Sequence, residues 1–315
     1  RQAGVEIPED IGGDPVPPQV QATAAAPVAP PPAAAALEPA AAVKAVEPAS
    51  TSRRVELDLS ALEASGITSP NSPRSLVADE YRVIKRPLIA NAMGKGAAPV
   101  ANGNLIMVTS ALPGEGKSFT AINLAMSIAM ELDNTVMLVD ADVARPSVLN
   151  MLGLPPAKGL LDVLVNDSVD LSQVLLKTNV EKLTLLPSGT QHPRATELLA
   201  SDAMVRLLDD MANRYSDRII IFDSPPLLLT TESRVLATHM GQIVMVVQAA
   251  RTLHAQVKQA LSTIEACPVK LMVLNKTSAA AGEGYGYGYG YGYGYYEDRG
   301  RDKRNKGFFA KLFGG

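Results

Sequence analysis

A glycine-rich stretch at residues 108–120 carries the residue types best suited to chemistry: Val-Thr-Ser-Ala-Leu-Pro-Gly-Glu-Gly-Lys-Ser-Phe-Thr. An apolar run at 105–108 leads into it, and a helical pattern follows from Lys117 to about Met130. A strand, a glycine turn and a helix start are the context of a phosphate-binding loop, where backbone N–H groups and the helix N-terminus hold phosphate oxygens. Lys117 would reach the β- and γ-phosphates and the Ser118 hydroxyl would hold Mg²⁺. The sequence therefore predicts a nucleoside triphosphate site.

Three aspartates stand at the ends of two further apolar runs. Asp140 and Asp142 follow the run 136–139, and Asp223 follows the run 219–222. In a parallel sheet the strand ends meet at one edge, so we expect these carboxylates beside the phosphate loop, where they could bind Mg²⁺. Each aspartate alone could instead cap a helix or a turn. The doublet offers a second acid, which can act as a base or position a nucleophile.

Short runs rich in Val, Ile and Leu recur along the middle of the chain and predict its fold. They are 105–108, 136–139, 183–186, 219–222, 243–247 and 271–274. Helical patterns lie between most of them, notably at 117–131, 196–212 and 253–265. Buried strands that alternate with helices predict an α/β fold with a doubly wound, mostly parallel sheet. In such a sheet the ligand lies at the carboxyl ends of the strands.

The composition changes twice along the 315 residues and predicts three parts. Residues 1–53 are dominated by Ala and Pro, which predicts a disordered linker, with partner binding as an alternative. Residues 54–278 have the pattern of the nucleotide-binding domain. Residues 279–315 hold a Tyr-Gly repeat and then a basic amphipathic end, which predicts a flexible tail.

Charge and cysteine content exclude several classes of protein. A net charge of −3 argues against a nucleic-acid surface. The one cysteine, Cys267, excludes a disulfide framework and favours a reducing cytosol. The three histidines do not have the spacing of metal ligands, which argues against a histidine metal site. No apolar run reaches the roughly 18 residues of a membrane-spanning helix, and no secretory signal is visible. We therefore expect a cytoplasmic protein.

The motifs resemble those of the bacterial tyrosine kinases, P-loop NTPases of the ParA/MinD-like type that control capsule and exopolysaccharide assembly. The resemblance covers about residues 75–296. It rests on the loop Pro113-Gly-Glu-Gly-Lys-Ser118, the doublet Asp140/Asp142, the motif Asp223-Ser-Pro-Pro and a terminal tyrosine cluster. The chain looks most like the exosortase-associated tyrosine autokinase branch. This resemblance implies an ATP:protein-tyrosine phosphotransferase that uses ATP and Mg²⁺ and regulates polymerisation and export of an exopolysaccharide.

The resemblance also implies roles for individual residues. The catalytic residues would be Lys117, Asp140 and Asp142, with Asp140 helping to deprotonate the tyrosine hydroxyl. The metal ligands would be Ser118, Asp142 and Asp223. The nucleotide-binding residues would be Pro113, Gly114, Glu115, Gly116, Lys117, Ser118, Phe119 and Asn275. One departure concerns an arginine that the family places two residues after the second aspartate, because this chain has Ala144 there and Arg145 next.

A charged segment upstream is similar to the Glu-x-x-Arg-x-x-Arg helix with which the family packs its subunits into a ring. The matching residues are Asp79, Arg82 and Lys85, and the resemblance implies a homo-oligomer with these residues at the interface. Lys85 replaces an arginine and cannot reproduce a bidentate guanidinium contact. The alternative is an ordinary charged helix face.

Seven of the nine tyrosines form a cluster near the C-terminal end: Tyr285, Tyr287, Tyr289, Tyr291, Tyr293, Tyr295 and Tyr296. Interleaved with glycine, they form no core, and a flexible tail of 15 residues covers about 20 Å, enough to reach a neighbouring subunit. We expect these tyrosines to be the phosphoacceptors. Each phosphate adds about −1.5 to −2 charges, and the mutual repulsion would loosen a ring. A low-complexity adhesive tail is the alternative.

The family needs a transmembrane activator, so the resemblance implies a separate chain-length-determinant partner in the membrane. We expect the protein at the inner face of the plasma membrane, without a nucleic-acid partner. The basic segment 303–313, with three phenylalanines, could lie on the membrane or dock a partner. The alternative function is a ParA/MinD-type positioning ATPase. Those relatives carry a lysine early in the loop, where this chain has Leu112, and they lack a tyrosine tail.

Overall fold

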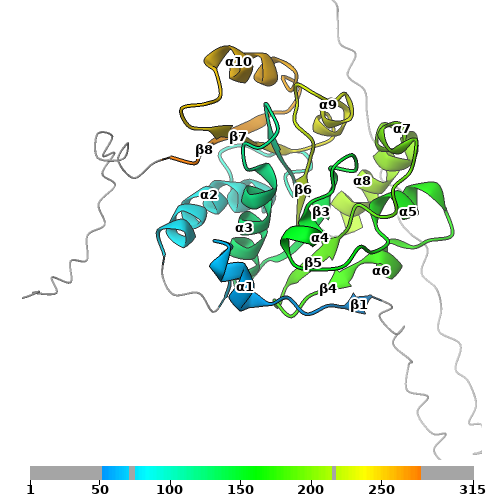
Figure 1. The fold of residues 1–315 in the computed structure, drawn as a ribbon. Coiled ribbons are helices and arrows are strands. Elements are labelled where there is room, and N and C mark those ends of the chain that lie inside the picture. Colours follow the sequence, from blue (N-terminus) through cyan, green and yellow to red (C-terminus); the bar gives the residue numbers. More distant parts are fainter. Residues whose placement is uncertain (1–51, 71–74, 215–217, 278–315) are drawn as a thin grey trace, which may run out of the picture. The chain divides into compact units, whose positions relative to one another are not determined.

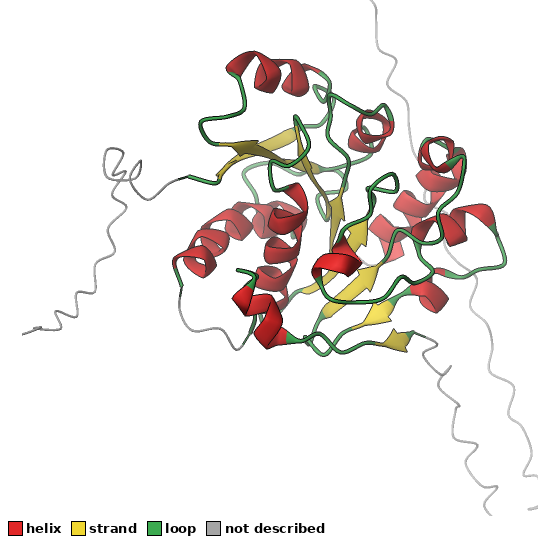
Figure 2. Cartoon of the chain, in the orientation of Figure 1, coloured by secondary structure: helices red, strands yellow, loops and turns green. Residues whose placement is uncertain are grey.

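An eight-stranded sheet is the frame of the described residues, which are 52–70, 75–214 and 218–277 of a computed structural model (Figures 1 and 2). Its strands are β1 (Arg53–Arg54), β2 (Leu105–Ser110), β3 (Thr135–Asp140), β4 (Leu176–Lys177), β5 (Leu183–Leu186), β6 (Arg218–Asp223), β7 (Gln242–Gln248) and β8 (Val269–Asn275). The strand order is β1-β4-β5-β3-β6-β2-β7-β8, and every neighbouring pair is parallel except β4 with β5. The expected doubly wound, mostly parallel α/β fold is confirmed, and all six predicted runs are strands.

Helices cover both faces of this sheet (Figure 1). One face packs against α1 (Leu59–Ala64), α2 (Leu76–Ala92), α3 (Lys117–Ala129) and α4 (Val148–Met151). The other packs against α5 (Leu160–Val165), α6 (Leu171–Val174), α7 (Ala195–Leu199), α8 (Asp202–Arg214), α9 (Glu232–Ala237) and α10 (His254–Ser262). The described helices and strands therefore form three layers.

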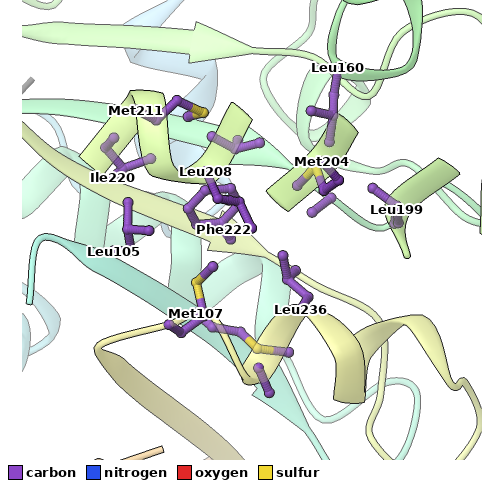
Figure 3. Close-up of a cluster of buried hydrophobic side chains, with 14 of the residues drawn as sticks. Leu105, Met107, Leu160, Leu199, Met204, Leu208, Met211, Ile220, Phe222 and Leu236 are labelled. Carbon is purple, nitrogen blue, oxygen red and sulfur yellow. The ribbon is translucent and has the colours of Figure 1, made fainter. Parts of the chain in front are cut away.

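Alternate side chains of the central strands enter two separate hydrophobic cores, which explains their unbroken apolar sequences. In β2, Ile106 and Val108 pack in the core under α3, whereas Leu105 and Met107 pack in the opposite core. Figure 3 shows that second core, where Phe222 of β6 lies among side chains of α8 and α9. Burial on both faces is the expected property of strands in a parallel sheet covered by helices.

The helical patterns are confirmed with one difference. The segment 196–212, expected as one helix, is divided into α7 and α8 at Ala200 and Ser201. The Ser201 hydroxyl accepts a hydrogen bond from the N–H of Met204 at 3.3 Å, so it caps the start of α8. Strands β1 and β4 were not predicted, because two residues are too short to show a period.

Strand β1 also moves the boundary of the expected domain. Arg53 pairs with Leu176 of β4, so residue 53 already belongs to the sheet, one residue before the expected start at 54. Residues 1–51 of the linker predicted at 1–53 lie outside the described residues, as does the tail predicted at 279–315. The described part contains no helix long and apolar enough to cross a membrane.

Candidate active site

The predicted phosphate-binding loop connects β2 to α3 at the carboxyl edge of the sheet (Figure 1). Gly114 and Gly116 have φ angles of 79° and 99°, in the left-handed region that glycine adopts at little cost. Gly116 precedes the first residue of α3, so the turn and the helix N-terminus face the same space. A side chain at Gly116 would also collide with Asn275, whose Nδ2 lies 2.1 Å from the position a Cβ would take.

Residues that follow β7 and that end β8 bind the loop through hydrogen bonds. Glu115 is only 3% exposed, and its carboxylate accepts hydrogen bonds from the Leu112 N–H, at 2.8 Å, and from the Thr252 hydroxyl. Asn275 Nδ2 donates to the Glu115 carbonyl at 2.9 Å, and Lys276 Nζ donates to the Gly114 carbonyl at 2.6 Å. In this structure the side chains of Glu115 and Asn275 thus position the loop, and their expected part in nucleotide binding stays a proposal.

Lys117 brings the aspartates of the two neighbouring strands together. Its Nζ lies 2.7 Å from Asp142 Oδ2 and 3.5 Å from Asp223 Oδ1. Burial acts against the charge of Lys117, but the carboxylates of Asp223 and Asp142 outweigh it and raise the lysine pKa. The lysine is therefore protonated at neutral pH and close to the oxygens that were expected to organise Mg²⁺.

Asp140 and Asp223 end adjacent strands and face each other in the β3–β6 register. Burial, followed by repulsion from Asp223, raises the pKa of Asp140 to about 7. Burial also raises the pKa of Asp223 to about 6, although the nearby Lys117 ammonium opposes this rise. Two acids with raised pKa values at one edge of a sheet have the character of a functional site.

Both carboxyl oxygens of Asp223 are buried without a hydrogen-bond partner among the described residues. Buried polar oxygens normally have partners, so such a carboxylate is suited to act as a ligand of a cation. Mg²⁺ takes one or two carboxylates and completes its shell with phosphates and waters. The donor set of Ser118, Asp142 and Asp223 suits that ion. The described part contains no group of three or more His, Cys, Asp or Glu side chains that could hold a metal ion.

A cleft of about 690 Å³ opens beside the loop, lined by most of the predicted nucleotide-binding residues. Those on its wall are Pro113, Gly114, Gly116, Lys117, Ser118 and Phe119, and the predicted metal ligand Asp142 also lines it. Arg145 also lines it, and the Arg145 N–H donates to Asp142 Oδ1 at 3.1 Å. The arginine that departs from the family spacing is therefore still beside the expected phosphate position.

Ser147 is a member of this constellation that the sequence analysis missed. Its hydroxyl donates to Ser118 Oγ at 2.9 Å, and its N–H donates to Asp140 Oδ2 at 3.1 Å. Ser147 precedes the apolar residues of α4, so a serine at a helix start was the available signal. Thr252 and Lys276 were also missed, and no sequence pattern near them pointed to contact with the loop.

The three residues expected at an oligomer interface differ in exposure, because Asp79 and Arg82 are exposed and Lys85 is buried. Asp79 and Arg82 form an exposed ion pair on α2, between the exposed side chains of Leu76 and Val83. Lys85 corrects the expectation: it is 4% exposed, donates to the Ser127 carbonyl at 2.6 Å and lies 2.7 Å from Glu131 Oε1. The ammonium of Lys85 bonds to groups of the same chain, so Lys85 links α2 to the C-terminal end of α3. The seven expected phosphoacceptor tyrosines lie outside the described residues.

Comparison with known proteins places this geometry in a family. A family model described as an AAA domain matches residues 103–275. Tyrosine-protein kinase YwqD of Bacillus subtilis (strain 168) is 32% identical over 206 residues, which are 65% of this chain and 83% of that protein. The crystal structure of the chimerical protein CapA2B2 superposes with a TM-score of 0.56 at 28% identity, covering 70% of this chain and 99% of that chain.

A second solved structure, the VpsO kinase domain, superposes with a TM-score of 0.55 at 25% identity, covering 64% of this chain and 96% of that chain. The matched AAA domain runs from the start of β2 to the end of β8, so it contains the loop, Lys117 and all three aspartates. The chain therefore belongs to the bacterial tyrosine-protein kinases.

Proposed function

We propose that the chain transfers the γ-phosphoryl group of ATP to tyrosine, and that its main acceptor is its own tyrosine cluster. The observation that carries the proposal is the contact of Lys117 with both Asp142 and Asp223 below a glycine loop. Phosphoryl transfer depends on positioning and on stabilisation of charge by cations, and this arrangement supplies a fixed ammonium and ligands for a metal.

The proposed roles follow from the contacts. N–H groups of the loop would hold the phosphates, with Lys117 at the β- and γ-oxygens. Ser118, Asp142 and Asp223 would hold Mg²⁺, which when bound neutralises charge on the transferred phosphoryl group. Asp140 would accept the tyrosine proton, because its Oδ2 is engaged by Ser147 and Val148 whereas its buried Oδ1 has no hydrogen-bond partner within the described residues.

The tyrosine cluster at 285–296 is proposed as the acceptor, phosphorylated by a neighbouring copy in a ring-shaped homo-oligomer. Phosphates on alternate residues repel one another and the acidic site, so modification would release the tail and loosen the ring. Asp79 and Arg82 remain the proposed contact residues on α2.

The proposed setting is the inner face of the plasma membrane, where a transmembrane chain-length-determinant protein would activate the kinase and thereby control exopolysaccharide polymerisation and export. The described residues contain no helix suited to a membrane span. Membrane association through a separate partner is part of the proposal.

The test incubates the purified full chain with ATP and Mg²⁺, with and without the cytoplasmic part of a candidate activator, and reads intact mass and phosphotyrosine. We expect added phosphate masses that map to 285–296, and their loss in Lys117→Met. Lys258→Met on α10 is the matched control, because that lysine is exposed and distant from the loop in sequence. ATP turnover without phosphotyrosine under every condition would contradict the proposal and favour a positioning ATPase.

A further inference from the structure

Strand β8 forms one end of the sheet, and its outer edge pairs with no other strand in the part of the chain that the structure describes (Figure 1). Along all seven residues β8 pairs in parallel with β7, and the Asn275 carbonyl accepts the N–H of Ala249 on that side. Successive residues of a strand alternate in direction, so the N–H and C=O groups of Lys270, Met272 and Leu274 point to the outer edge. Such a row of groups is a template for a further strand.

The side chains of β8 differ between its two faces. Leu271 and Val273 are half-buried and pack against the core under α3. Met272 and Leu274 point to the opposite face, the one on which α10 lies, and are 54% and 62% exposed. Lys270 is the one charged residue of β8, and the strand contains no proline, although charges and proline are what natural sheets use to protect an edge. The edge and its apolar face are therefore suited to pairing with another strand.

The chain that follows β8 has the sequence of a strand that fits this edge. Tyrosine and glycine alternate from Tyr285 to Tyr295, so in an extended conformation all of these tyrosines lie on one face and all of the glycines on the other. Lys276 has a φ angle of 58°, in the left-handed region, so the chain bends directly after β8 ends. Residues 276–284 are enough to reverse the chain, since hairpin loops commonly have about two to five residues.

An antiparallel return along β8 gives a consistent register. Each outward-pointing residue of β8 then has a tyrosine directly opposite: Leu274 with Tyr285, Met272 with Tyr287 and Lys270 with Tyr289. Directly opposite residues lie on the same face, so aromatic rings cover the exposed methionine and leucine, and such aromatic pairs with aliphatic and sulfur-containing side chains are favourable. The glycines lie on the other face and add no bulk beside Leu271 and Val273.

We propose that the segment 285–289 of this same chain adds to the outer edge of β8 as an antiparallel strand while its tyrosines carry no phosphate. A phosphate adds about −1.5 to −2 charges, and a group of that charge is costly to pack on Met272 and Leu274. Modification of a docked tyrosine therefore disfavours the docked state. The docking goes beyond the proposed kinase function and is independent of it, whereas the release by phosphate rests on that function.

The repeat makes this docking tolerant of the first phosphates. A slip of the pairing by two residues keeps every tyrosine on the same face, so any three successive tyrosines of the repeat can cover β8. A phosphate on one tyrosine excludes the registers that use it and leaves the others. Release of the tail is therefore expected after several phosphates rather than after one.

Hydrogen exchange of the unphosphorylated protein, without ATP, measures the docking. The two proteins compared are the full chain and a chain that ends at Thr277, which keeps all the described residues. We expect the amides of Lys270, Met272 and Leu274 to exchange about tenfold more slowly in the full chain, the protection given by a strand that is docked about nine-tenths of the time. Phenylalanine at all seven cluster positions should keep this protection, and glutamate at the same positions should abolish it.

Disulfide trapping measures the register. Met272→Cys is combined with Tyr287→Cys in one protein and with Gly286→Cys in the matched control, while the native Cys267, which is 2% exposed, stays in place. Opposite residues of an antiparallel pair have Cα atoms about 5.5 Å apart, within the range of a disulfide. The bond should form about tenfold faster with Tyr287→Cys, because the glycine positions point their Cβ atoms to the other face.

Equal exchange of segment 269–275 in the full chain and in the chain that ends at Thr277 would overturn the proposal. Protection that persists in the shortened chain and grows with protein concentration would assign the edge to a second copy, and it would overturn the proposal as well. Equal trapping at tyrosine and glycine positions would refute the strand pairing. None of these results would affect the kinase function. Absence of phosphotyrosine under every condition, with the protection intact, would refute the kinase function and leave the docking standing.

Discussion

The ammonium nitrogen of Lys117 lies 2.7 Å from Oδ2 of Asp142, and the two side chains are 11% and 6% exposed. One ammonium here faces three buried carboxyl groups, because Asp140 and Asp223 end the adjacent strands. Phosphates that bind beside Lys117 add negative charge to a site where three carboxyl groups already outnumber the single ammonium. The arrangement therefore favours a triphosphate that arrives together with a divalent cation.

Replacement of Asp223 by asparagine should lower kinase activity strongly without lowering the thermal stability of the protein. Burial raises the pKa of Asp223 even though Lys117 Nζ lies 3.5 Å from its Oδ1, so the fold disfavours the charged carboxylate, and removal of the charge should leave the melting temperature of the metal-free protein unchanged or higher. Tyrosine phosphorylation should fall by about 100-fold or more, the size of effect typical for loss of one electrostatic contact in an active site. Differential scanning fluorimetry with ATP alone and with ATP and Mg²⁺ should show that the variant loses the stabilisation added by magnesium.

Asp209→Asn on α8, an exposed position, is the control. A variant that keeps the magnesium effect would exclude Asp223 from the metal site.

The free protein should become less stable as the pH rises from about 5 to 8. The pKa of Asp140 is about 7 in the folded chain, above the ordinary aspartate value near 3.8. A carboxyl with a raised folded-state pKa stabilises the fold fully below its unfolded pKa, and this contribution is lost as the pH rises through the folded value. Melting curves in EDTA should show the decline, and Asp140→Asn should reduce it. An identical pH dependence in the variant would contradict a raised pKa at Asp140.

Two neighbouring basic residues of α2 should differ in their importance for stability. Lys85→Met should lower the free energy of unfolding by about 2 to 3 kcal/mol, because it removes a buried hydrogen bond to Ser127 and an ion pair with Glu131. Arg82→Met should cost less than about 1 kcal/mol, because the Arg82–Asp79 pair is exposed. Urea unfolding of both variants measures the contrast. Similar losses of unfolding free energy in the two variants would contradict a buried Lys85 bound to Ser127 and Glu131.

The hydrogen bond between Thr252 and Glu115 should matter for ATP more than for folding. Thr252→Val removes the hydroxyl partner of a carboxylate that is 3% exposed and that also holds the Leu112 N–H. We expect the KM for ATP to rise about fivefold or more, since a loop that must be ordered by its ligand reduces the apparent affinity. Hydrogen exchange at residues 112–116 should become faster. Thr263→Val, where a hydroxyl bonds only its own helix end, should change neither quantity.

The positions of the main site residues could be predicted from the sequence, whereas the contacts that support them could not. The loop glycines, Lys117 and the three aspartates could be placed because each stands at the end of an apolar run, and parallel strands bring such ends to one edge. Thr252 and Lys276 contact the loop from positions far away in the chain, and local patterns contain no information on such contacts. Ser147 gave only the general signal of a serine at a helix start, which does not predict its contact with Ser118.

The fold shows the same division between local and long-range information. Six strands can be recognised as apolar runs and the main helices by their period, whereas β1 and β4, with two residues each, are too short for either signal. The burial of Lys85, which the resemblance placed at an oligomer interface, could not be predicted for a different reason. A charged residue on an amphipathic helix is normally solvated, but the buried Ser127 carbonyl and the half-buried Glu131 carboxylate both bind the ammonium of Lys85.

The bonds from Asn275 and Lys276 to the loop carbonyls have a practical consequence for anyone who shortens this protein. Lys276, which follows β8 and precedes the tyrosine cluster in the chain, donates to the Gly114 carbonyl. The segment just after β8 is therefore bonded directly to the phosphate-binding loop. A version that ends after β7, or even at Leu274, would lose both of these donors. Removal of the tail for crystallisation or for binding assays should therefore cut after Thr277, since an earlier cut would weaken nucleotide binding for reasons unrelated to the tyrosines.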